Sequence, residues 1–205
     1  MVMMQVNRLL SVALFVGAGV VAAAQSGVAP NGIDLSLLTK ANGGDASAEV
    51  AVGEQLARAA TMEHDRTRLA EDYRQELAWY LKAAEQKDVS AELHLAALYR
   101  DGGGDTIARN MEQAAAWYRK AAEQGDASAQ GTLGLLYTMG QGVPRDDVEA
   151  YFWLDLAARA TGPNQQKYAA NRQLVGEHIT AEELAGVEDR VTAWETAHPV
   201  TKPRQ

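Results

Sequence analysis

The chain has 205 residues, with 19 lysines and arginines against 27 aspartates and glutamates, a formal net charge of −8 and no cysteine. This acidic balance, without any cluster of five basic residues, argues against a nucleic-acid-binding surface. The lack of cysteine excludes disulfides and a lipid-modified N-terminal cysteine, so packing alone must stabilise the fold.

The first 24 residues have the pattern of a secretory signal peptide. A single basic residue, Arg8, precedes an apolar run over residues 9–24 that ends in three alanines. This pattern predicts cleavage between Ala24 and Gln25. A retained membrane anchor is the alternative, but a spanning helix needs about 20 apolar residues, and this run is shorter and contains two glycines. We therefore expect a periplasmic or secreted protein that has no stable membrane insertion after cleavage.

An all-α fold is predicted for the rest of the chain. Residues 25–44 contain Pro30 and paired glycines, which indicate a linker or a loosely packed N-terminal cap. From residue 45 onward apolar residues recur at spacings of three and four, and strong helix formers dominate. A block of nine residues that begins at Ala78 returns almost verbatim from Ala116, 38 residues later. This period is typical of stacked helical hairpins.

Three hairpins are expected, at about 45–88, 89–125 and 126–162. In the first, the connection between the two helices is predicted to be long, over residues 57–75. Large aromatic residues recur at the repeat period, and we interpret them as core packing between successive hairpins, since a ligand site would not need this period. These residues are Trp79, Trp117 and Trp153.

Capping signals mark the helix ends. Asn110 and Gln113 predict a reciprocal cap at the start of the second helix of the middle hairpin, and Gly125 predicts its end. Thr180 and Glu183 form a capping-box pattern that opens a helix before Pro199. We expect residues 163–199 to form a C-terminal helical cap and residues 200–205 to be a tail.

The repeated segments resemble the SEL-one-like repeat family, which is related to the tetratricopeptide repeats. The resemblance is carried by residues 117–127, by residues 129–137 and by the turn at 140–146, and it covers about 44–162. It implies a right-handed superhelical solenoid that serves as an adaptor or scaffold for other proteins. Exported bacterial members are associated with envelope polysaccharide secretion, signalling, virulence interactions and toxin neutralisation, and the resemblance does not choose among these.

No pattern of catalytic or metal-binding residues is found in the sequence. Glu63, His64 and Asp65 are adjacent, but further ligands at metal-binding spacing are missing, so a solvated loop is the preferred interpretation. Neither a Gly-x-Ser-x-Gly elbow nor a Ser-x-x-Lys pair occurs in the part that would remain after cleavage. We therefore expect a non-enzymatic protein without metal or cofactor. A hydrolase of cell-wall material or β-lactams is the least favoured alternative.

The predicted binding surface is the concave face of the solenoid, formed by the first helix of each hairpin. Its mixture of apolar and polar residues suits a bound peptide or helix. The expected function is that of a periplasmic adaptor for another protein. An immunity or inhibitor protein against a secreted toxin is the alternative, and a peptidoglycan fragment is a further ligand left open. The candidate contact residues are Glu54, Arg58, Leu93, Ala97, Arg100, Leu135, Thr138 and Met139.

Overall fold

The computed structural model describes residues 33–62 and 66–198. The predicted signal peptide, the C-terminal tail and the Glu63-His64-Asp65 segment lie outside these residues. Within the two described ranges the chain forms nine α-helices and no strand, which confirms the all-α prediction. The helices are α3 (Leu35–Asn42), α4 (Ala46–Met62), α5 (Arg66–Glu85), α6 (Val89–Asp101), α7 (Met111–Glu123), α8 (Ala127–Met139), α9 (Asp147–Arg159), α10 (Gln165–Gly176) and α11 (Ala181–Ala197).

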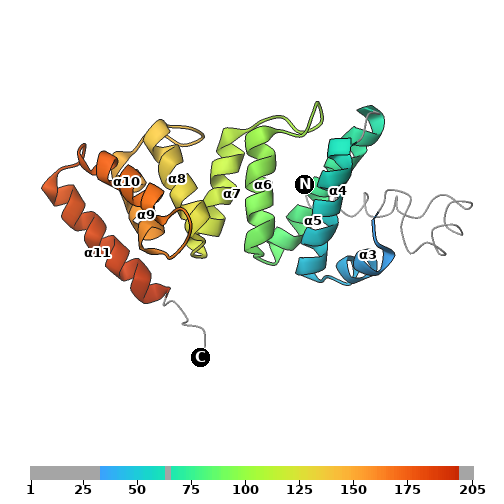
Figure 1. Ribbon diagram of the computed structural model, residues 1–205, viewed down its shortest axis with the longest axis horizontal. Coiled ribbons are helices and arrows are strands. Elements are labelled where there is room, and N and C mark those ends of the chain that lie inside the picture. The colour runs from blue at the N-terminus through green and yellow to red at the C-terminus, as the bar shows by residue number, and fades with distance from the viewer. Residues whose placement is uncertain (1–32, 63–65, 199–205) are drawn as a thin grey trace, which may run out of the picture.

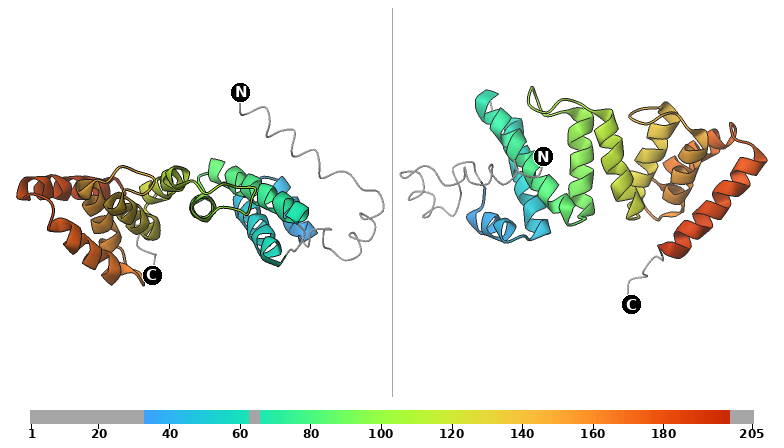
Figure 2. Two further views of the ribbon diagram at one scale, coloured as in Figure 1. Left: turned by 90° about the horizontal axis from the view of Figure 1, so that it is seen from above. Right: turned by 180° about the vertical axis from the view of Figure 1, so that it is seen from behind.

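The helices form an elongated array of hairpins. Helices α4 and α5 pack as the first pair, α6 and α7 as the second, and α8 and α9 as the third. Successive pairs meet through α5 with α6 and through α7 with α8, and they follow one another along the long axis of the molecule (Figures 1 and 2). Helix α3 packs on α4 at one end, while α10 and α11 pack on α9 at the other.

The same local device opens the first helix of each hairpin. An aspartate side chain accepts a hydrogen bond from the backbone N–H three residues later, and that residue is a buried alanine in every case. The pairs are Asp45 with Ala48, Asp88 with Ala91 and Asp126 with Ala129. The aspartate satisfies a free N–H of the helix terminus, and the alanine lets the neighbouring helix approach closely.

Two details of the sequence-based description were wrong. The long connection predicted at residues 57–75 is mostly helical, because α4 continues to Met62 and α5 begins at Arg66. This segment is rich in alanine, arginine and glutamate, which favour helix. The reciprocal cap at Asn110 is also incomplete. Its side chain accepts from the N–H of Gln113 as predicted, but its own N–H donates to the carbonyl of Tyr99 at 2.7 Å instead of to the Gln113 side chain.

The three repeated tryptophans differ in burial. Trp153 is only 4% exposed and lies in the largest apolar cluster, so the core interpretation is confirmed for this residue. Trp117 is half-buried and packs against both clusters that flank it. Trp79 is also half-buried. A lysine one turn later covers each of these two rings, with its ammonium 5.1 Å (Lys82) or 3.6 Å (Lys120) from the ring centroid.

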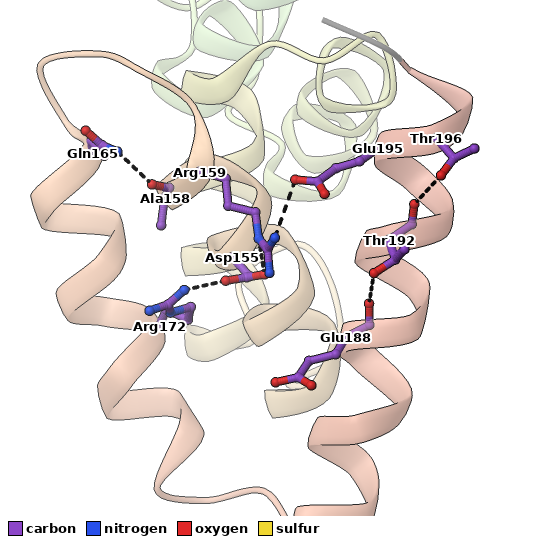
Figure 3. A network of polar contacts seen from close by, with 9 residues as sticks. All are labelled: Asp155, Ala158, Arg159, Gln165, Arg172, Glu188, Thr192, Glu195 and Thr196. Carbon is purple, nitrogen blue, oxygen red and sulfur yellow. Dashed lines mark hydrogen bonds and ion pairs between the residues drawn. The ribbon is translucent and has the colours of Figure 1, made fainter.

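Helices α10 and α11 are held to α9 by charged side chains as well as by apolar packing. Figure 3 shows Asp155, which is 3% exposed, between two arginines. Arg159 donates to it at 2.7 Å and Arg172 pairs with it from α10. Arg159 also reaches Glu195 on α11 at 3.6 Å.

The capping box of Thr180 and Glu183 opens α11 as predicted. In the described part of the chain, no helix is long and apolar enough to cross a membrane.

Candidate binding groove

A groove of about 430 Å³ lies where the first hairpin meets the second. Helices α4, α5 and α6 each contribute to its wall or floor. The lining combines four carboxyl or imidazole side chains with the apolar side chains of two alanines and a leucine. The lining residues used below are Glu54, Ala57, Arg58, Glu76, Tyr80, His94, Ala97, Leu98 and Asp101.

The ring of Tyr80 occupies a position that depends on a glycine in the facing helix. Tyr80 is 1% exposed, and a Cβ atom placed on Gly53 would lie 2.5 Å from its ring. Only glycine therefore lets the ring lie so close to α4. The imidazole of His94 stacks parallel to the Tyr80 ring, with 4.6 Å between the ring centroids. The phenol and the imidazole are thus fixed by packing.

Charged groups surround these two rings. The Nε2 atom of His94 lies 3.3 Å from a carboxylate oxygen of Glu54, and Arg58 lies 3.4 Å from the other oxygen. Glu54 is therefore shared between two partners. Burial raises the pKa of the Tyr80 hydroxyl above its ordinary value, and the carboxylates of Glu76 and Glu54 raise it further. Tyr80 is therefore a neutral hydroxyl in this groove.

Glu76 is the unusual residue of the site. It is 6% exposed, and its Oε2 atom is buried without a hydrogen-bond partner among the residues that the structure describes. Burial raises the pKa of this carboxyl from 4.5 to about 7. A buried carboxylate without a partner is costly, and such groups are frequent at functional sites. When Glu76 is ionised, its charge has no hydrogen-bonding partner at this oxygen among the described residues.

The structure brings together three of the eight predicted contact residues. Glu54, Arg58 and Ala97 line the groove. Arg100 is an exposed residue of α6, but its guanidinium pairs with Asp101 at 2.7 Å and donates to the hydroxyl of Tyr118 at 2.8 Å. Partner binding at any of these residues stays a prediction.

The remaining four predicted residues lie outside the groove. Leu93 and Leu135 are half-buried and pack against the largest apolar cluster. Thr138 donates its hydroxyl to the carbonyl of Gly134 at 3.0 Å, and Met139 is 55% exposed at the end of α8. None of these four residues lines the groove that contains Glu54.

The sequence-based description missed Glu76, Tyr80 and His94 as residues of this groove. Glu76 lay next to the predicted long connection, where burial was not expected. One signal could have found it. The 38-residue offset of the repeat aligns Glu76 with Ala114, so a carboxylate replaces a methyl group at a position that is buried in the next hairpin.

The described part of the chain shows no candidate metal site. No group of three or more histidine, aspartate or glutamate residues is placed to hold a metal ion within residues 33–62 and 66–198. Among the described residues that line the groove there is also no serine, threonine or lysine to act as a nucleophile.

Comparison with known proteins identifies the repeated unit. The Sel1 repeat family model matches residues 69–88, 89–126 and 127–161. The first match begins within α5 and does not include α4. No functionally curated protein matches the chain.

Two solved structures show the same fold. A Sel1 repeat protein from Oxalobacter formigenes is 32% identical with a TM-score of 0.52, and the match covers 64% of this chain and 49% of that one. A protective antigen of uropathogenic Escherichia coli that displays an SLR fold is 22% identical with a TM-score of 0.53, covering 82% of this chain and 43% of that one. The chain spans less than half the length of either relative.

Proposed function

Because the chain is a Sel1-repeat protein, we propose that it is a non-enzymatic adaptor that binds another protein through its concave face. Sel1 repeats generally mediate protein–protein interaction. The observation that carries the proposal is the groove between the first two hairpins, which combines apolar wall residues such as Ala97 and Leu98 with a buried, unpaired carboxylate at Glu76. A surface of this kind suits a side chain that projects from a partner protein.

We propose further that the protein works outside the cytoplasm. The support is the N-terminal pattern described above, with Arg8 before an apolar run that ends at Ala24. N-terminal sequencing of the protein isolated from its own cells tests this point. A mature chain that begins at Gln25 supports export, and a chain that retains residues 1–24 contradicts it.

An inhibitor of a secreted toxin is the second candidate function. It is favoured by the net charge of −8 and by the carboxylates of the groove, which would suit a basic toxin. The two candidates differ in the origin of the partner, because an adaptor binds a protein of its own cell and an immunity protein binds one delivered by a rival.

Site-specific photo-crosslinking tests the binding face. A photoreactive amino acid replaces Ala97, which lines the groove, or Ala116, which is exposed on α7 and lies outside it. Both changes replace an alanine in a helix, so they are matched chemically. We expect a discrete protein adduct from position 97 and none from position 116 in intact cells. Identical adducts from both positions, or none from either in the presence and absence of rival cells, would contradict the proposal.

Turnover assays test the non-enzymatic part of the proposal. The purified protein is expected to leave a chromogenic β-lactam and peptidoglycan fragments unchanged. Hydrolysis that is lost when His94 is replaced by alanine would overturn this part, because His94 is the imidazole that faces the groove.

A further inference from the structure

The junction between the first and second hairpins can be compared with the next junction along the array. In the second helices, the 38-residue offset aligns Tyr80 with Tyr118 and Glu76 with Ala114. In the first helices, the aligned alanines Ala48 and Ala91 give an offset of 43 residues, which places Ala57 opposite Arg100. Both tyrosines are buried, with exposed fractions of 1% and 5%, so each junction has a buried tyrosine at the aligned position.

The second junction contains its own arginine. The Nη1 atom of Arg100 donates to the hydroxyl of Tyr118 at 2.8 Å, and the rest of the guanidinium pairs with Asp101. At this junction, an arginine guanidinium is therefore the group that binds the hydroxyl of the buried tyrosine. At the first junction the aligned residue is Ala57, which is too short to reach the tyrosine, and Glu76 adds a carboxylate where the second junction has Ala114.

Resting on the proposed function, we propose that the groove between α4, α5 and α6 binds an arginine side chain of the partner protein, with its guanidinium at the Glu76 carboxylate and the Tyr80 hydroxyl. This guest would occupy the place that Arg100 takes at the second junction. A guanidinium carries several N–H donors in one plane, so it can serve a carboxylate and a hydroxyl together. Its aliphatic stem would lie along Ala57, Ala97 and Leu98.

The other carboxylates of the groove already have partners, so Glu76 is the carboxylate proposed to bind the guanidinium. On α6, Asp101 is paired with Arg100. On α4, Glu54 is paired with Arg58 and with His94 of α6, and the Arg58 side chain is 77% exposed. Glu76 alone among the carboxylates of the lining has a buried oxygen without a partner in the described chain. A cationic guest beside Glu76 would offset the charge of its ionised carboxylate.

Binding should also depend on pH. Burial raises the pKa of Glu76 to about 7, so the free groove holds a mixture of neutral and ionised Glu76 near neutrality. The guanidinium binds the ionised form. Affinity is therefore expected to rise as the pH increases from 5.5 to 8, and Glu54, Arg58, Tyr80, His94 and Asp101 are the other titratable groups that face the groove.

A peptide titration tests the inference. The ligand is acetyl-Gly-Arg-Gly-amide, and its control carries citrulline, which keeps the shape of arginine but has no charge. Binding is followed at pH 8 by the NMR shifts of the Ala57 and Ala97 methyl groups. A single side chain should bind with a Kd on the order of millimolar. We expect the citrulline peptide to bind at least about tenfold more weakly, which is the loss of one charge-assisted contact.

Variants of the chain complete the test. Glu76→Gln should weaken arginine-peptide binding about tenfold or more. Glu71→Gln, a change of the same charge on an exposed residue one and a half turns away on α5, should leave binding unchanged. The helical circular dichroism spectrum and the melting temperature show that each variant is folded. Equal binding of the citrulline peptide, or full affinity in Glu76→Gln, would overturn the inference.

The outcome is separable from that of the crosslinking experiment. A protein adduct at position 97 together with no binding of the arginine peptide overturns the arginine inference and leaves the proposed function intact. Arginine-specific binding that depends on Glu76, without any protein adduct at position 97, supports the arginine site and contradicts the adaptor function.

Discussion

Replacing Glu76 by glutamine should stabilise the protein at alkaline pH. The carboxyl titrates near 4.5 when exposed, and burial raises its pKa to about 7 in the folded chain. The folded state therefore disfavours the ionised form. Stability from this group is fully present below about pH 4.5 and is lost as the pH rises through 7. The shift corresponds to about 3 kcal/mol at most, and access of water to the groove should reduce the effect to about 1 to 3 kcal/mol.

The assay is urea unfolding of the parent, Glu76→Gln and Glu71→Gln at pH 5 and pH 8, followed by circular dichroism. At pH 8, Glu76→Gln should have a free energy of unfolding about 1 to 3 kcal/mol above that of the parent. At pH 5 the difference should shrink, because Glu76 is then mostly protonated in the folded chain. Glu71 is exposed, so its variant should follow the parent at both values. A Glu76→Gln variant that is less stable than the parent at pH 8 would refute the reasoning.

Three further predictions concern stability, each measured as a change in the free energy of unfolding by urea titration. Gly53→Ala should destabilise the protein by about 1 to 2 kcal/mol, because the new Cβ meets the Tyr80 ring at 2.5 Å. Gly186→Ala has open space around it in α11 and should stabilise the protein by about 0.5 to 1 kcal/mol. Equal effects of the two changes would contradict the close approach of the Tyr80 ring to Gly53. Trp153→Ala should cost about 3 to 5 kcal/mol and Trp117→Ala about 1 to 2, since only Trp153 is fully enclosed, and the reverse order would show that the burial difference is wrong. Asp155→Ala should cost about 2 to 4 kcal/mol by releasing two arginines from α9 and α10, and a neutral effect would mean that the network in Figure 3 does not hold the C-terminal helices.

The repeat made the architecture predictable from the sequence. Apolar spacing and the near-verbatim block from Ala78 and Ala116 determine helix content and hairpin order, since these depend on local residues and on a fixed period. Local caps such as Thr180 with Glu183 were predictable for the same reason. The cap at Asn110 was only partly predictable, because its N–H finds a partner, Tyr99, that is 11 residues away in the chain.

The groove was harder to predict because it depends on contacts between distant segments. Glu54, Glu76 and His94 lie on three helices, and no local pattern shows that they share one cavity. The burial of Glu76 results from the way α4 and α6 cover α5. The lysines that cover Trp79 and Trp117 are a similar case, since sequence periodicity alone indicated core packing for all three tryptophans.

The most direct test of the central claim is the pKa of the Glu76 carboxyl itself. It can be measured by carbon-13 NMR on protein labelled at glutamate side chains, with Glu76→Gln used to assign the signal. We predict a midpoint near 7, because the carboxyl group is buried and one of its oxygens has no partner among the described residues. Addition of the arginine peptide should move that midpoint to lower pH. A midpoint at or below 4.5 in the free protein would show that the carboxylate is hydrated or already paired. That result would contradict the proposal that the groove binds a cationic side chain at Glu76.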